Sequence, residues 1–323
     1  MARAPNETKH IPLGAEPAPV RERRTFPLVP RHRLVGLPFG DLPSRRRGHG
    51  SDVIGHRRYE PGDPVSTIDW FASARLSTAT GGDEFVVRAR AADEAPRVAL
   101  VLDRRPAMRL YPAPLPWLPK HVVLREAVAT IAASAAAARA DLAVLDFAGE
   151  EERWLPPGRR ERQWLALERA AGTPFDAPED TVELLLEALG RHRSELPGDT
   201  FVFVLSDFLA PTRPEAWLDA IGHGWDLVPV VIRDPVWEGS FPAVAGVAVP
   251  IADVRGGRGS LVRLTRRQAQ RRRDEHERRH ASLLADFESL GLRPIELGTC
   301  DPAAIDGAFI AWAEERRRSR WAR

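Results

Sequence analysis

The sequence predicts an α/β protein with a doubly wound, mostly parallel sheet and a small β-rich module ahead of it. Strands buried on both faces of a parallel sheet are almost continuously apolar. Two such runs occur, at residues 97–103 and 201–205, and further strands are expected at 143–147 and 227–232. Segments of helical pattern separate them, and alternation of strand and helix is typical of a doubly wound fold. With 323 residues, the chain can bury one large core and support a smaller module.

The remaining elements follow from local pattern. A charged hairpin and helix fill residues 149–171, where Trp154 and Trp164 are expected to anchor the core. A weak alternation over 243–251 indicates an edge strand or hairpin, and 293–297 indicates a last short strand. Helices are expected at residues 120–140, 181–189, 214–221, 264–290 and 301–318.

Changes in composition divide the chain into four parts. Residues 1–34 are rich in Pro, Arg and Glu and lack periodicity, so we expect a disordered or loosely bound arm. Residues 35–94 form the β-rich module and 95–312 the α/β domain. Residues 313–323 are a basic tail, which we expect to be a frayed end.

The composition excludes several classes of protein. The net charge of +2 excludes a polyanion binder by overall charge, and 43% hydrophobic with 28% charged residues is ordinary for a globular protein. A single cysteine, Cys300, excludes an internal disulfide framework and fits a reducing compartment. Neither an apolar stretch of membrane-spanning length nor a signal core is visible, so a cytoplasmic location without a membrane span is expected.

The stretch from Arg57 to Arg75 reads as a strand end, a tight turn and a short helix. Pro61 and Gly62 suit the turn, and Ser66 or Thr67 is expected to cap the helix. Charged side chains crowd this segment, which favours a paired ionic network. Its expected members are Arg57, Arg58, Asp63, Asp69 and Arg75.

This stretch resembles the signature of the domain-of-unknown-function 58 family (DUF58), R-x-Y-x-x-G-D-x-x-x-x-I-D-W-x-x-x-A-R. The matching residues are Arg57, Tyr59, Gly62, Asp63, Ile68, Asp69, Trp70, Ala74 and Arg75. The likeness extends over roughly residues 35 to 310. It implies a domain similar to von Willebrand factor type A. It also implies a partner, because such proteins are often encoded beside MoxR-type AAA+ ATPases.

Type A domains hold a divalent metal at the carboxyl ends of their strands, through D-x-S-x-S, a Thr and a second Asp. Here Asp103 matches the first Asp, Asp207 matches the second, and Thr181 is a candidate for the Thr. The serine positions hold Arg105 and Ala107 instead. A guanidinium offers no lone pair and repels a cation. We therefore expect a degenerate site without metal or other cofactor, in which Arg104 or Arg105 pairs Asp103 and Asp207.

Two alternatives stay open. One is a type A binding module that still depends on Mg²⁺ at Asp103, Thr181 and Asp207. The other is a zinc hydrolase, because residues 276–280 read H-E-x-x-H and place His276 and His280 on one helix face. Charged flanks and the lack of a third ligand at a recognised spacing argue against the hydrolase.

The same helix could bind nucleic acid through the seven arginines between Arg266 and Arg279. Asp274, Glu275 and Glu277 interrupt that basic face, and stacking aromatic residues are absent. A solvent-exposed helix laced with salt bridges is the favoured interpretation, and no specific nucleic-acid partner is expected.

Taken together, these patterns favour a non-enzymatic protein-interaction or adaptor protein. By analogy with the family, it would act with a MoxR-type AAA+ ATPase in protein-complex maturation. Within the signature, Arg57, Asp63, Asp69 and Arg75 are expected to hold the module against the α/β domain. The competing hypothesis is that they stabilise only the local turn.

Overall fold

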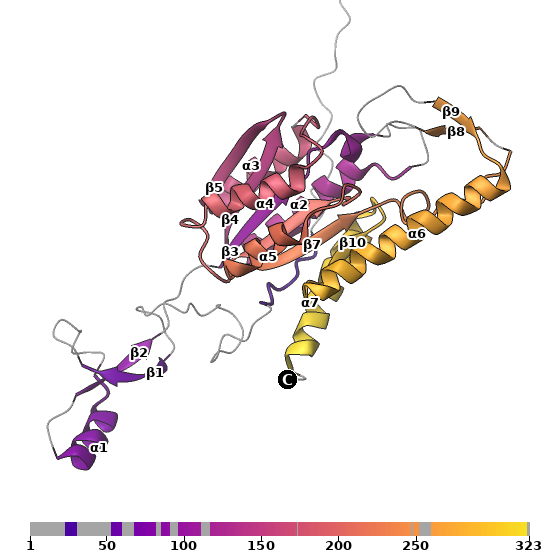
Figure 1. Cartoon of the computed structure of the whole chain (residues 1–323). Helices are drawn as coiled ribbons and strands as arrows, with labels where there is room; N and C mark the ends of the chain where they lie inside the picture. The colour runs from indigo at the N-terminus through magenta and orange to yellow at the C-terminus, as the bar shows by residue number, and fades with distance from the viewer. Residues whose placement is uncertain are drawn as a thin grey trace, which may run out of the picture.

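The computed structural model contains an α/β body and a small separate unit formed by β1, α1 and β2 (Figure 1). The described residues are 23–30, 53–59, 68–81, 85–90, 96–110, 117–172, 174–246, 248–251 and 260–321. Among them, no helix has the length and apolar character needed to cross a membrane.

A six-stranded sheet forms the centre of the body, and only its last strand runs antiparallel to its neighbour. In spatial order the strands are β10 (Ile295–Leu297), β7 (Asp226–Ile232), β6 (Phe201–Ser206), β3 (Arg97–Leu102), β4 (Asp141–Ala148) and β5 (Glu151–Gly158). Every residue of β6 and β7 is buried, which is why these strands lack an alternating pattern. The predicted doubly wound, mostly parallel sheet is confirmed.

Helices cover both faces of the sheet. One face packs against α2 (Lys120–Ala137), α3 (Arg160–Gly172) and α7 (Pro302–Trp321). The other face packs against α4 (Thr181–Arg191), α5 (Pro214–Gly222) and the second half of α6 (Arg266–Ser289). Trp164 does not anchor this core as predicted, because it lies on the outer side of α3 with 73% of its surface exposed.

Residues 23–30 belong to the body, which corrects the prediction of a disordered or loosely bound arm over this part. Phe26 is buried against Phe309 and Trp312 of α7, with ring centroids 5.0 and 5.9 Å away. Its backbone N–H donates to Ser134 Oγ of α2 at 3.1 Å. The segment therefore seals the seam between α2 and α7.

The basic tail also differs from the prediction. Helix α7 continues to Trp321, so residues 313–321 are helical and not frayed. Arg316 is buried, and its guanidinium bonds both oxygens of Asp226 at 2.6 and 2.9 Å and the Val29 carbonyl at 3.2 Å. Because one charge of this pair lies at the start of β7, the tail fixes both the sheet and the N-terminal segment.

The small unit consists of an antiparallel pair, β1 (Val53–Arg58) and β2 (Val86–Arg90), with α1 (Trp70–Thr80) between them in sequence. Asp69 is the N-cap of α1, and its Oδ1 accepts the Ala72 N–H at 3.0 Å. This corrects the prediction that Ser66 or Thr67 caps the helix. Ser73 Oγ accepts the Val86 N–H at 2.8 Å and so joins α1 to β2.

A second projection carries the two-stranded ribbon β8 (Ala248–Ile251) and β9 (Ser260–Arg263), together with the first turns of α6 (Figure 1). It corresponds to the edge strand or hairpin predicted near 243–251. The ribbon and helix share a small core of Phe241, Leu264 and Ala269. Thr265 caps α6 through a capping box with Gln268, which fixes where the helix starts.

Candidate functional site

The candidate site lies at the carboxyl edge of the parallel sheet. Strands β3 and β6 are neighbours in parallel register, so the residues that follow them emerge at the same edge. Asp103 follows β3 and Asp207 follows β6, and the Asp103 N–H donates to the Leu205 carbonyl at 3.0 Å. The topology therefore brings together the two carboxylates that the sequence singled out.

Arg105 fills the space between these carboxylates. Its Nε lies 2.9 Å from Asp103 Oδ2, and its Nη2 donates to Asp103 Oδ2 at 2.5 Å and to Asp207 Oδ1 at 2.6 Å. All three side chains are buried. Burial opposes the charge on Arg105, but Asp103 and Asp207 outweigh it and raise its pKa above the ordinary value. The guanidinium therefore stays charged and bridges both acids.

Lys120, at the start of α2, supplies a second buried cation. Its Nζ donates to Asp207 Oδ2 and to Glu238 Oε1, each at 2.7 Å. Burial opposes the charge, yet Asp207 and Glu238 raise the pKa of Lys120. Burial raises the pKa of Glu238, whereas Lys120 and Arg105 overcome burial at Asp207 and lower its pKa. Neither Lys120 nor Glu238 was predicted as a site residue, because their roles depend on tertiary contact.

Internal donors also occupy the remaining oxygen positions of the two aspartates. Ser206 Oγ donates to Asp103 Oδ2 at 2.7 Å, and the Arg105 N–H donates to Asp103 Oδ1 at 2.8 Å. The Leu209 N–H donates to Asp207 Oδ1 at 3.0 Å. Each carboxylate oxygen is thus already bonded within the protein, and two fixed cations lie beside them.

This arrangement does not fit a divalent cation. Mg²⁺ and Ca²⁺ require several oxygen ligands, and here a cation would have to displace Arg105 and approach Lys120. The described residues also contain no group of three or more His, Cys, Asp or Glu side chains placed to hold a metal. Ala107 is buried and offers no oxygen at the second serine position.

Thr181 stands at the first position of α4 and is fully buried. Its Oγ1 has no hydrogen-bond partner among the described residues. Thr181, the candidate for the ligand Thr, therefore forms no side-chain hydrogen bond with Arg105, Asp103 or Asp207.

Arg104 points away from Arg105 and toward α3. Its Nη2 donates to the Arg169 carbonyl at 2.6 Å and its Nη1 to the Ala170 carbonyl at 3.4 Å, so it caps the C-terminal end of that helix. Its Nε donates to Asp146 Oδ2 at 3.2 Å. Burial lowers the pKa of Arg104 despite the attraction of Asp146. Of the two arginines considered from sequence, Arg105 makes the bridging contacts and Arg104 does not.

Arg233 holds the turn that presents Asp207. Its Nε donates to the Asp207 carbonyl at 2.6 Å and its Nη2 to the Phe208 carbonyl at 2.8 Å. Phe208 has a φ of 49°, in the left-handed region that a bulky residue seldom adopts. Two bonds from one buried guanidinium offset this strain and fix the geometry of the site.

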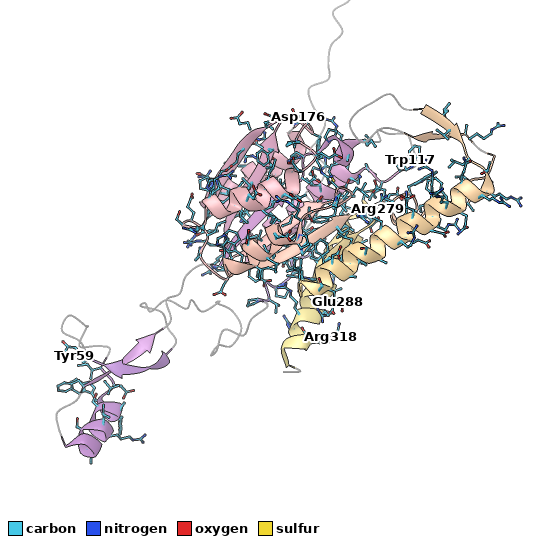
Figure 2. The ribbon with its side chains drawn as sticks, viewed as in Figure 1. Tyr59, Trp117, Asp176, Arg279, Glu288 and Arg318 are labelled. Carbon is cyan, nitrogen blue, oxygen red and sulfur yellow. The ribbon has the colours of Figure 1, made fainter. Side chains whose placement is uncertain are left out.

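The signature residues lie in the small unit. Tyr59 donates its backbone N–H to the Phe85 carbonyl at 2.8 Å (Figure 2 labels Tyr59), Asp69 caps α1, and Arg75 is exposed in the middle of α1. Trp70 is 60% exposed and packs edge-on against Phe85. Gly62, Asp63 and the side chains of Arg57 and Arg58 lie outside the described residues. The predicted ionic network thus stays a prediction.

The H-E-x-x-H sequence lies on α6, and its histidines already have protein partners. His276 Nδ1 lies 2.9 and 3.0 Å from the Trp237 and Ser240 carbonyls. His280 Nε2 lies 3.0 Å from Glu296 Oε2, and its Nδ1 lies 3.3 Å from an Arg233 nitrogen. These contacts connect α6 to the 237–240 turn and to β10, and they offer no specific support for a zinc site.

Solved structures similar to this chain include BatB, a conserved hypothetical protein from Bacteroides thetaiotaomicron. It has a TM-score of 0.40 and 12% identity, covering 68% of this chain and 99% of that chain. An aerotolerance-related membrane protein from Bacteroides fragilis has a TM-score of 0.39 and 12% identity, covering 66% and 98%. The pilus adhesin SpaC from Lactobacillus rhamnosus GG has a TM-score of 0.43 and 8% identity, covering 69% and 30%.

No curated protein matches the sequence. A family model does match, over residues 55–282, which include the signature from Arg57 to Arg75, the candidate site and most of α6. The chain therefore belongs to the family described as "Protein of unknown function DUF58".

Proposed function

We propose that this protein is a non-enzymatic protein-interaction protein that binds its partner without a divalent cation at the sheet edge. In the finer form of the proposal, it acts in the cytoplasm as an adaptor for a MoxR-type AAA+ ATPase in protein-complex maturation. The observation that best supports binding without a divalent cation is the Arg105 guanidinium, which bridges Asp103 and Asp207.

The charge balance of the site supports binding without metal. Arg105 and Lys120 bring two positive charges to three carboxylates, those of Asp103, Asp207 and Glu238. An added divalent cation would meet two fixed like charges and would gain only oxygens that are already hydrogen-bonded. An exposed metal can accept an oxygen from a partner, whereas a buried guanidinium with its donors in use does not.

The small unit supports a role in protein recognition. Three aromatic side chains on this unit are exposed: Trp70 at 60%, Phe71 at 84% and Phe85 at 45%. Trp70 and Phe85 touch each other, so the exposed rings include one contiguous pair. Large apolar side chains gathered on a surface mark sites of interaction with other proteins, and aromatic residues are favoured at such interfaces.

Titration calorimetry tests the metal-free part of this proposal. Mg²⁺ or Mn²⁺ added to the purified protein should give only heats of dilution, because Arg105 holds the position between the aspartates. The matched variant carries Arg105→Ser and Ala107→Ser, which restores both serines of the type A motif. Saturable heat with the wild-type protein would overturn the metal-free site and favour the Mg²⁺-dependent alternative.

Co-elution tests the partnership. The purified protein and a MoxR-type AAA+ ATPase from the same organism are mixed with nucleotide and analysed by size-exclusion chromatography with light scattering. A complex is expected, and Phe71→Ser should weaken it while leaving the melting temperature unchanged. The matched control is Leu218→Ser, which removes an apolar side chain 54% exposed on α5. Absence of a complex would refute this ATPase as the partner.

A further inference from the structure

The first turns of α6 and the adjacent strand β9 project from the body (Figure 1) and are rich in arginine. From Ser260 to Arg273 the sequence holds six arginines and no acidic residue. Four of the six are exposed, and we call them the basic tip: Arg263, Arg266, Arg267 and Arg271. Within the described part of the chain, no carboxylate forms an ion pair with any of these four.

The basic tip differs from the solvent-exposed, salt-bridged helix that the sequence predicted. Within α6 a single ion pair links described residues, between Arg279 and Glu275 at 3.2 Å. Glu275 stands four residues after Arg271, the last arginine of the basic tip, and pairs with Arg279 instead. Among the described residues, the acidic side chains that follow in α6 therefore form no ion pair with the arginines of its first two turns.

The electrostatics of the helix start make it costly to place arginines there. Arg266 and Arg267 occupy the first two positions of a 24-residue helix, where the helix dipole is already positive. The capping box completes its hydrogen bonds with Gln268, where a glutamate would serve equally well and would add a negative charge. The first turn contains no acidic residue. Positive potential is thus concentrated at the tip, and an anionic partner would offset it.

The tip is also held rigidly. Arg273 Nε donates to the Phe241 carbonyl at 2.8 Å, and the Arg272 guanidinium lies 6.0 Å above the Phe241 ring. Leu264 and Ala269 are buried in the same small core. The exposed arginines therefore extend from a preorganised surface, which lowers the ordering cost of binding.

We propose that the basic tip docks an acidic segment of a partner protein that carries an apolar side chain. Leu261, on β9 beside Arg263, is 73% exposed and requires an apolar counterpart that a phosphate backbone does not offer. A lipid surface would require a broader apolar face, whereas Val262 is half-buried and Leu264 is buried. This inference is independent of the ATPase partnership and of the metal-free site.

The test uses a fluorescein-labelled peptide of 16 residues, in which single Glu residues alternate with Leu-Asp pairs. The full chain is titrated into the peptide, and fluorescence anisotropy measures binding. Saturable binding is expected at about 50 mM NaCl, with marked weakening at about 500 mM because exposed charges are screened. The triple variant Arg263→Glu, Arg266→Glu and Arg267→Glu should lose about tenfold or more in affinity, equivalent to one decade in Kd.

The matched control reverses three exposed arginines elsewhere on the body: Arg159→Glu, Arg193→Glu and Arg293→Glu. Both triple variants change the net charge from +2 to −4, since each reversal removes two units. The control variant should lose less than about twofold in affinity for the peptide. Equal losses in the two variants would overturn the proposal, because net charge alone would then explain binding.

Leu261→Ser separates the proposed partner from other anions. This substitution should weaken binding of the peptide several-fold. It also tests the inference if the triple variant folds poorly. Absence of saturable peptide binding would overturn the proposal. Tip-dependent binding of a 20-base-pair DNA or of phosphatidylserine vesicles in place of the peptide would also overturn it, in favour of nucleic acid or membrane.

Discussion

Arg105 Nη2 lies 2.6 Å from Asp207 Oδ1, although the two residues are 102 positions apart in the sequence. The same nitrogen lies 2.5 Å from Asp103 Oδ2. One side chain therefore ties the end of β3 to the end of β6 inside a buried site.

Removing this guanidinium leaves buried charge without a partner. Arg105→Ala should lower the free energy of unfolding by about 3–5 kcal/mol, because breaking one side of a buried ion pair costs that much. Urea denaturation followed by circular dichroism measures the loss. Arg109→Ala, at an exposed position in the 3-10 helix Pro106–Arg109 that follows Arg105, should change stability by about 0.5 kcal/mol or less. A loss below about 1 kcal/mol for Arg105→Ala would contradict a structural role for the bridge.

The stability contribution of Asp207 should depend on pH. Burial raises its pKa, but Lys120 and Arg105 outweigh burial, so the folded pKa lies below the unfolded one. The unfolded chain then binds more protons in acid, and the stability is present above about pH 4 and is lost below it. The difference in unfolding free energy between wild type and Asp207→Asn should narrow by about 1 kcal/mol from pH 7 to pH 3. A difference that stays constant or widens in acid would refute this sign.

Phe26 should contribute to stability as a core residue does, although its sequence segment predicts a loosely bound arm. Its ring stacks on Phe309 and contacts Trp312 and Phe203. Phe26→Ala should cost about 3–5 kcal/mol, as other large aromatic deletions from cores do. Phe71→Ala, which removes a ring that is 84% exposed, should cost about 0.5 kcal/mol or less. Similar losses for both variants, measured by chemical denaturation, would rule out selective packing of the segment.

Asp69 should stabilise α1 through its side chain. Asp69→Ala removes the cap on the Ala72 N–H and should cost the helix about 0.5–2 kcal/mol, whereas Asp69→Asn keeps an effective N-cap. Hydrogen–deuterium exchange of the α1 amides measures both changes. If Asp69→Asn keeps slow exchange but abolishes binding to the ATPase, the carboxylate itself serves recognition. If exchange accelerates equally in both variants, the charge of Asp69 serves the local structure.

The fold was predictable because its elements carry their own signals. The strand sequences VALVL at 98–102 and FVFVL at 201–205 are too apolar for a half-exposed strand, and they became the two central neighbours of the sheet. Asp103 and Asp207 were predictable as a pair because parallel strands release their carboxyl ends at one edge. The absence of oxygen ligands at Arg105 and Ala107 was likewise visible in sequence.

Other features depended on long-range contact. A basic residue at the start of an Ala-rich helix gives no sign that Lys120 meets Asp207 and Glu238, 87 and 118 residues away. Phe26, in a segment rich in Pro and Arg, is buried only because α2 and α7 leave a seam for it. Trp164 shows the converse, since an aromatic residue in a helix can face solvent when its neighbours already fill the core.

By itself, the sequence determined the alternation of strand and helix, the family signature and the loss of both serines at the type A position. Those features are local, because they depend on periodicity, on turn chemistry and on which atoms a side chain carries. Tertiary structure alone decided that Arg105 and not Arg104 bridges the aspartates and that Lys120 joins them. Adjacent side chains leave the end of a strand toward opposite faces of the sheet, and only the packing of α2, α3 and the 237–240 turn determines which partners they meet.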